Sequence, residues 1–427
     1  MGYLGKLYIY CVKNTLGASN KQVLNVFKMI LKQTKMKQLL TILLIGFLAV
    51  SCKTTKQSQS TPNENLKIYT DFLKKEHTSS KDYVFELFKK YDIVILCERD
   101  HGEITQYDLI IDILKDTRFQ HIQNVYTEIG NSQYNDLLND FLHNSSLTND
   151  QVAKTALKMQ RNMYPLWEKT NYLYFLKSVH TINSKLKDEK KVNVFNLDFG
   201  ILWEASDEEK KNQSAMHSSD RDSFIAGGFI KYYKKSKTKK ALVILNYRHA
   251  FLRDMFGRKN AGRFIADEFG SKVANVYINS FILKSTKVTD QEVPVTAIGT
   301  PHDGKWEASF IKSGKKDIAF NFANTPFGND SFDMMPFPNN LKYSDVFTGF
   351  IHYNYFPDLR RVLGIDGFID DEFYKELAKR YQFYDEEIPP KNELKTDYNT
   401  VMEVTYREEF SDAVKEIEKW VSESLNK

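Results

Sequence analysis

Four short apolar runs in this chain each stop at charged or histidine side chains. The runs span residues 93–97, 125–127, 192–197 and 241–246. The polar side chains that close them are, in chain order, Glu98 with His101, Glu128, Asp198, and Arg248 with His249. A short apolar run bounded by polar loops is typical of a strand that is buried on both faces. This repeated pattern constrains the fold more than any other feature of the sequence.

The segments between these runs have helical periodicity or helical length. After the first run, apolar residues follow at i, i+3, i+4 and i+7, namely Tyr107, Ile110, Ile111 and Leu114. Strands that alternate with helices predict an α/β fold, with a mainly parallel central sheet and helices on both faces. Residues 132–187 are too long for one crossover, so we expect a helical insertion of two or three helices there.

Other parts of the chain predict further elements. Helices are expected over 66–75, 82–90, 261–269 and 410–421. Strands are expected over 273–283, 318–322 and 346–351, and a loop-rich stretch over 285–316.

The four strand ends predict a shared site. In a parallel sheet the carboxyl ends of the strands meet at one edge, where ligands bind. A carboxylate that holds an imidazole in one tautomer lets the histidine act as a general base toward water. An arginine stabilises a developing oxyanion or binds a substrate carboxylate or phosphate. Two histidines with carboxylates also match the ligand set of a divalent transition metal, and the residues alone do not choose between these chemistries.

Other catalytic signatures are absent from the sequence. It has no G-x-S-x-G elbow, Walker loop, G-x-G-x-x-G after a strand, H-E-x-x-H or C-x-x-C motif. These absences exclude the serine-hydrolase, nucleotide-binding and zincin classes. Cys97 lies at the end of an apolar run, so we expect a buried thiol rather than a nucleophile.

The N-terminal region has the pattern of a secretory leader. A basic segment at 35–37 precedes an apolar run over 39–50, which is shorter than a typical transmembrane helix. Residues 48–52 resemble a bacterial lipobox, which implies cleavage before Cys52 and lipidation of its thiol. The expected organisation is an N-terminal extension with signal peptide over 1–51, a flexible tether over 52–65, and a single domain over 66–427.

This leader also explains the charge of the chain. Residues 1–51 hold seven lysines and no acidic residue, so the remainder carries a net charge of −2 within the total of +5. A nucleic-acid partner is therefore not expected. The expected location is the bacterial cell envelope, with a lipid anchor in the membrane at the periplasmic or outer-membrane face, and the expected partner is a small-molecule substrate.

Several motifs resemble those of the erythromycin esterase family. Residues 95–102 are similar to its G-E-x-x-H-G motif, and residues 125–128 to a strand that a glutamate closes. Further similar segments, in chain order, are 196–198, 221–226, 245–249 and 344–349. The broader superfamily includes Tiki-type metalloproteases and haem-uptake lipoproteins of the ChaN type.

The resemblance implies an α/β hydrolase core in which a Glu–His pair activates water without a metal. Glu98 and His101 would be that pair. Glu128 would orient the histidine or share its proton, and His249 would contact the substrate carbonyl or the water. The residues that would bind substrate are Arg248, Asp198 and Arg221.

Two positions depart from the family pattern. Cys97 stands where the first motif begins with glycine, and Asn246 replaces the first histidine of an H-N-x-H strand end, which removes one potential metal ligand. The function we expect is a membrane-anchored envelope hydrolase that cleaves an ester or related bond without a cofactor. The alternatives are a non-enzymatic lipoprotein that binds haem or a metal, and a peptidase of the Tiki type that depends on a divalent metal.

Overall fold

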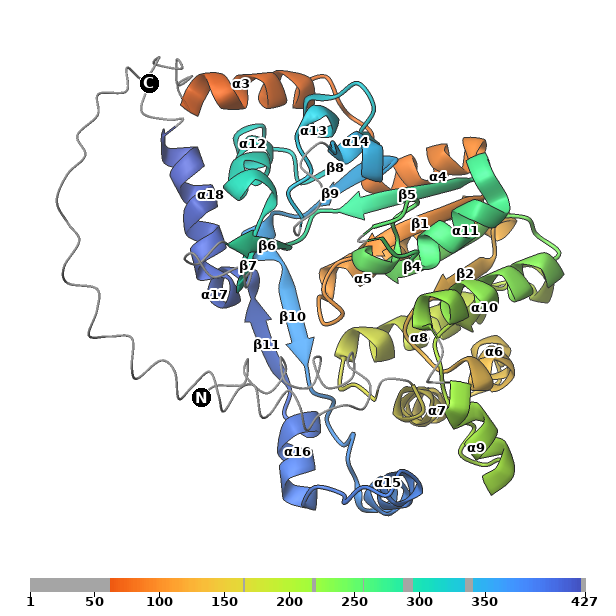
Figure 1. Ribbon diagram of the computed structural model, residues 1–427. Coiled ribbons are helices and arrows are strands. Elements are labelled where there is room, and N and C mark those ends of the chain that lie inside the picture. Colours follow the sequence, from red (N-terminus) through yellow and green to blue (C-terminus); the bar gives the residue numbers. More distant parts are fainter. Residues whose placement is uncertain are drawn as a thin grey trace, which may run out of the picture. The chain divides into compact units, whose positions relative to one another are not determined.

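The computed structural model describes residues 62–163, 166–216, 220–255, 257–286, 295–334 and 341–423. A seven-stranded sheet lies at its centre (Figure 1). In spatial order the strands are β3 (Asn193–Asn196), β2 (Asn124–Thr127), β4 (Ala241–Asn246), β1 (Ile93–Glu98), β5 (Val273–Ile278), β9 (Gly349–Tyr353) and β8 (Asp317–Asn321). All neighbours pair in parallel except β8, which is antiparallel to β9. The predicted leader and Cys52 lie outside the described residues.

Helices connect the strands of the main sheet, and more helices follow β9, its last strand in chain order (Figure 1). Those up to β9 are α3 (Pro62–Leu73), α4 (Ser80–Lys90), α5 (Thr105–Lys115), α6 (Asn135–His143), α7 (Asn149–Arg161), α8 (Thr170–Asn183), α9 (Asp207–Ala215), α10 (Arg221–Lys235), α11 (Ala261–Phe269), α12 (Lys305–Lys312), α13 (Pro326–Asn329) and α14 (Tyr343–Val346). The later ones are α15 (Asp371–Phe383), α16 (Lys391–Asn399), α17 (Tyr406–Glu409) and α18 (Ser411–Glu423). No helix within the described ranges is long and apolar enough to cross a membrane.

The central strand β1 is buried because helices cover both of its faces. Ile95 and Cys97 face a core that includes residues of α10 and α11. Val94 and Leu96 face a second core that includes residues of α4, α5 and the insertion helices α6, α7 and α8. Side chains alternate between faces along a strand, so an apolar run with no polar position is what a strand between two helical layers requires. The predicted α/β fold is confirmed.

Three predicted segments differ in the structure. The strand expected over 273–283 is interrupted after Ile278, where the backbone and side-chain oxygens of Asn279 both accept hydrogen bonds from Arg99 at 2.6 Å, and residues 282–283 begin a separate strand. The stretch over 285–316, expected to be loop-rich, contains α12, which buries Trp306 and Phe310 four residues apart. The strand expected over 346–351 begins later, with β9, and α14 precedes it.

Two small ribbons lie outside the main sheet. β6 (Ile282–Thr286) pairs with β7 (Val295–Gly299), and β10 (Arg360–Leu363) pairs with β11 (Met402–Thr405), each pair antiparallel. Figure 1 shows β10 and β11 side by side. The N–H of Ile104 donates to the carbonyl of Arg360, and the N–H of Val362 donates to the carbonyl of Gly102, at 2.9 and 3.2 Å. The β10–β11 ribbon is therefore hydrogen-bonded through its backbone to the loop that follows β1. At the other end of the described chain, α3 begins at Pro62, four residues before the expected start of the domain.

Candidate active site

The Glu98 carboxylate and the His101 imidazole form a pair at the end of β1. Glu98 Oε2 lies 2.7 Å from His101 Nδ1, and the two side chains are 2% and 16% exposed. The backbone turns around His101, where Asp100 Oδ1 accepts the N–H of Gly102 at 2.7 Å. With Nδ1 directed at the carboxylate, Nε2 is the outward nitrogen of His101. No hydrogen bond joins this Nε2 to any residue that the structure describes.

Three aromatic side chains surround this pair. Tyr107 of α5 donates its hydroxyl to Glu98 Oε1 at 2.8 Å. The hydroxyl of Tyr172 lies 3.4 Å from the same oxygen and 3.1 Å from His101 Nδ1. The Trp167 ring lies beside the imidazole, with 4.9 Å between centroids. Trp167 and Tyr172 belong to the predicted helical insertion, which therefore forms one wall of the site.

Burial and charge act on both members of the pair. Burial raises the pKa of the Glu98 carboxyl above its usual value, and the attraction of His101 offsets this only in part. Burial lowers the pKa of His101, but the charge of Glu98 and the hydrogen bond to it outweigh burial, so the pKa of His101 is raised. Both directions favour a pair that keeps one proton between its two groups near neutral pH.

The carboxylates that follow β2 and β3 share one guanidinium. Arg221, the first residue of α10, donates Nη2 to Glu128 at 3.0 Å and both Nε and Nη2 to Asp198, at 3.1 and 2.5 Å. Both carboxylates are buried. Burial raises the pKa of Glu128, but the charges of His249 and Arg221 outweigh burial and hold this pKa well below its usual value. Glu128 is therefore ionised at neutral pH.

His249, after β4, has a partner on each ring nitrogen. Its Nδ1 lies 2.7 Å from Asp222 Oδ1, and its Nε2 lies 3.1 Å from Arg221 Nη1. Because a guanidinium can only donate, Nε2 accepts this bond in the neutral form of His249, whose proton then lies on Nδ1 toward Asp222. The protonated form of His249 is the one whose charge lowers the pKa of Glu128. Asp222 was not among the predicted site residues. Its only signal in the sequence is its place beside Arg221 in the segment over 221–226, which resembles a motif of the erythromycin esterase family.

The groups around Glu98 and Glu128 form one site. Asn246 joins them, since its N–H donates to Glu128 Oε2 at 2.7 Å and its Nδ2 donates to the carbonyl of Arg99 at 3.1 Å. The charge of His101 also lowers the pKa of Glu128. Arg248 is exposed beside them, and its Nε donates to Asn246 Oδ1 at 3.2 Å. Every predicted site residue within the described ranges therefore lies at this edge of the sheet.

Metal chemistry and thiol chemistry were the other options at this edge of the sheet. No group of three or more His, Cys, Asp or Glu side chains in the described ranges is placed to hold a metal ion, and Arg221 binds oxygens of both Glu128 and Asp198. Cys97 is buried, as predicted, and burial raises the pKa of its thiol far above its usual value. A thiol that stays protonated is a poor nucleophile.

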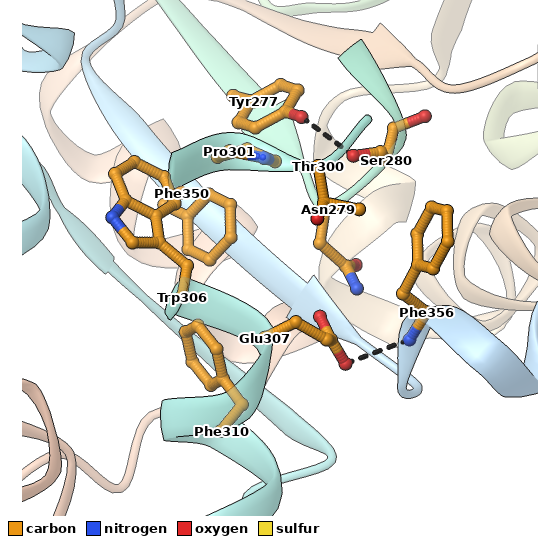
Figure 2. Close-up of a pocket in the computed structure, with 10 residues that line it drawn as sticks. All are labelled: Tyr277, Asn279, Ser280, Thr300, Pro301, Trp306, Glu307, Phe310, Phe350 and Phe356. Atoms are coloured by element: carbon orange, nitrogen blue, oxygen red, sulfur yellow. Dashed lines mark hydrogen bonds between the residues drawn. The ribbon is translucent and has the colours of Figure 1, made fainter. Parts of the chain in front are cut away.

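A small cavity lies beyond the end of β5, and Figure 2 shows its lining. The lining residues are Tyr277, Asn279, Ser280, Thr300, Pro301, Trp306, Glu307, Phe310, Phe350 and Phe356. Glu307 accepts the N–H of Phe356 at 2.8 Å in this lining. None of the predicted site residues lines this cavity, so it is separate from the candidate active site.

Comparisons with known proteins give distant structural matches. No protein-family model matches the chain, and no curated protein matches its sequence. A structural-genomics protein from Bacillus cereus matches with 12% identity and a TM-score of 0.47, covering 67% of this chain and 97% of its own. A mutant erythromycin esterase EreC in its open conformation matches with 10% identity and a TM-score of 0.42, covering 68% and 96%. Haem-bound ChaN of Campylobacter jejuni matches with 14% identity and a TM-score of 0.33, covering 53% and 94%.

Proposed function

We propose that this protein is a membrane-anchored cell-envelope hydrolase that cleaves an ester or related bond with water activated by Glu98 and His101. The observation that carries the proposal is the difference between the two histidines of the site. His249 has a partner on both ring nitrogens, whereas His101 has its carboxylate on Nδ1 and directs Nε2 outward. His101 is therefore the histidine that is arranged to exchange a proton with a reacting molecule.

The proposed reaction consumes one water molecule. His101 Nε2 takes a proton from the water while the water oxygen attacks the carbonyl carbon of the substrate. The same proton then passes from Nε2 to the leaving oxygen, so that an acid and an alcohol are released and His101 is neutral again. Glu98 accepts the hydrogen bond from Nδ1–H throughout, and its negative charge stabilises the imidazolium that forms between the two transfers.

We assign the other polar residues to the same centre. Glu128 is ionised, and its negative charge stabilises the protonated state of His101. Arg221 and Asp198 fix Glu128 in place, and His249 completes this network next to the substrate. Arg248 is exposed, and its guanidinium is suited to bind the oxyanion of the tetrahedral intermediate or an anionic group of the substrate.

The direct test is an unbiased screen of ester and amide hydrolysis with the purified wild-type protein and His101→Ala. Loss of a general base costs about 10²–10⁴-fold in rate, so His101→Ala should lose at least about 100-fold in kcat/KM while it keeps its circular-dichroism spectrum. The matched control is His121→Ala, because His121 is exposed and lies at the end of a short 3₁₀ turn before β2. Equal, small losses in the two variants would contradict the proposal.

Metal and haem measurements separate the alternatives. The proposed hydrolase should keep its activity after treatment with chelator and show no Soret band when haem is added. Stoichiometric metal with activity that disappears on its removal would favour the peptidase. A Soret band, together with no activity in the screen, would favour a haem-binding lipoprotein.

The membrane anchor has a test of its own. Cys52→Ser should leave an unprocessed precursor or move the protein out of the membrane fraction, with hydrolysis by the purified domain unchanged. A variant that fractionates and migrates like the wild type would remove the anchor from the proposal but leave the hydrolase.

A further inference from the structure

The loop that carries His101 contacts a strand distant in sequence. Arg361 lies on β10, and its Nε is 2.9 Å from Asp100 Oδ1. Its Nη1 donates a hydrogen bond to Glu409. The same Asp100 oxygen accepts the N–H of Gly102, the residue after His101. Arg361 thus reaches the turn that sets the direction of the imidazole, without touching the site itself.

Glycine at position 102 allows this approach. A side-chain carbon there would lie 3.3 Å from Arg361 Nε, 3.2 Å from Leu363 and 3.1 Å from Asp100 Oδ1. These distances are tighter than ordinary contacts in a packed interior. The turn and β10 are therefore packed directly against each other.

β10 holds the aromatic wall of the site as well. The N–H of Gly364, immediately after β10, donates to the carbonyl of Glu168 at 2.9 Å, and Thr170 Oγ1 donates to the carbonyl of Gly364 at 2.6 Å. Glu168 directly follows Trp167, and Thr170 is the first residue of α8. From α8, Asn171 donates its Nδ2 to the carbonyl of His101 at 2.9 Å. One short strand therefore links the histidine loop with the tryptophan that lies beside the imidazole.

We infer that Arg361 is a positioning residue for His101, which it acts on through Asp100 and the turn at Gly102. This inference rests on the proposed role of His101 in hydrolysis. Residue 361 touches no reacting atom, so its effect should appear in kcat more than in KM. A misplaced general base loses rate steeply, because proton transfer needs near hydrogen-bond distance.

The test compares Arg361→Gln with Arg360→Gln, its neighbour on β10. The Arg360 side chain pairs with Glu403 in an exposed contact away from the turn. We expect Arg361→Gln to lower kcat about 10–100-fold with KM nearly unchanged, and Arg360→Gln to leave both near the wild-type values. Arg361→Lys should restore only part of the rate, since one ammonium replaces a guanidinium that bridges two carboxylates.

A second measurement reads the position of His101 without substrate. In histidine-labelled protein, with the signal assigned by His101→Asn, the pH titration of His101 is followed by NMR. Loss of a nearby cation alone would raise the pKa of His101, whereas separation of His101 from Glu98 would lower it. The inference predicts a downward shift in Arg361→Gln, and an upward or absent shift overturns it. This readout still tests the inference if the hydrolase proposal fails.

Asp100→Asn provides the second variant if Arg361→Gln does not fold. The amide oxygen can still accept the N–H of Gly102, but the charge that Arg361 binds is lost. The same fall in kcat is expected, and kcat is the readout for this variant, because loss of the Asp100 charge by itself lowers the pKa of His101. Full wild-type values in Asp100→Asn would overturn the inference.

Discussion

Two ionic pairs, Glu98–His101 and Arg99–Glu103, overlap within residues 98–103. They differ in whether a side-chain nitrogen of the pair is left without a hydrogen bond. The Arg99–Glu103 pair is fully buried, with Nη1 2.9 Å from Oε2. Its guanidinium also donates to two oxygens of Asn279, just beyond β5, and to the carbonyl of Tyr353, the last residue of β9. The Glu98–His101 pair is made from neighbouring residues, yet it leaves an outward ring nitrogen.

This difference indicates that the Arg99–Glu103 pair supports the loop, whereas the Glu98–His101 pair is available for chemistry. A buried ionic group whose hydrogen bonds are all made cannot exchange them for a substrate without a large cost. Arg99 is such a group, and it fixes the loop against two strands on the far side of β1. Because the loop is held there, His101 can keep an unbonded ring nitrogen without collapse of the turn. The site therefore depends on both pairs, in different ways.

The largest effect should come from Arg99→Met, which removes the buried cation and leaves Glu103 without its partner. Breaking a buried pair in this way costs about 3–5 kcal/mol in the free energy of unfolding. The control is Arg118→Met, because Arg118 pairs with Asp116 and Asp82 at an exposed site and should cost about 0–1 kcal/mol. Urea unfolding of both variants measures the difference. Similar losses in the two would mean that the buried pair is not the support.

Glu98→Gln should change the pH dependence of hydrolysis more than the fold. In the wild type His101 is protonated up to a pKa above its ordinary value of about 6.5, because Glu98 outweighs the effect of burial. The rate should therefore rise with pH through this raised pKa. In Glu98→Gln burial acts without the carboxylate, so the acid limb of kcat/KM should move to lower pH and the maximal rate should fall.

The control for this shift is Glu86→Gln, on the exposed face of α4. Its profile should overlay that of the wild type. An acid limb that stays in place in Glu98→Gln would mean that the limb reports another group, and the Glu98–His101 mechanism would then be wrong.

The sequence predicted the sheet well because the apolar runs are local signals. β1 and β4 lie where the runs over 93–97 and 241–246 placed them, apart from the final residue of β1. Strand ends were predictable for the same reason, since a parallel sheet gathers them at one edge. The single strand over 273–283 was wrong because it is interrupted between β5 and β6, where the carbonyl of Asn279 accepts a hydrogen bond from Arg99, 180 positions earlier.

The supporting residues of the site could not be predicted in this way. Arg361 reaches Asp100 from a separate ribbon, and Tyr172 reaches His101 from the insertion. Nothing in the spacing of an arginine or a tyrosine shows which distant carboxylate or imidazole it will contact. Asp222 stands closer to a recognisable motif, but its partner His249 is 27 positions away. Contacts of this kind follow from packing, which a single sequence does not reveal.

A smaller effect is expected from Tyr172→Phe. Its hydroxyl lies farther from the pair than that of Tyr107, at 3.4 Å from Glu98 and 3.1 Å from His101, whereas Tyr107 bonds Glu98 at 2.8 Å. A typical hydrogen bond contributes about 0.5–1.5 kcal/mol, so Tyr172→Phe should lose less than about tenfold in kcat/KM. Tyr107→Phe, measured in the same assay, should lose more. The reverse order would show that the insertion contributes more to the site than the shorter bond from α5.

The smallest effect should come from Cys97, which lies next to Glu98 on β1 but faces the opposite core. Its thiol is 1% exposed, and burial raises its pKa far above its usual value, so no thiolate forms near neutral pH. Thiol-directed reagents should therefore leave hydrolysis unchanged in the folded protein and react with Cys97 only after unfolding. Cys97→Ala should lower stability somewhat through lost packing and keep kcat/KM within about twofold, since the replaced atom contacts no group of the pair. Inactivation of the wild type by such a reagent, with protection in Cys97→Ala, would transfer the chemistry from His101 to the thiol.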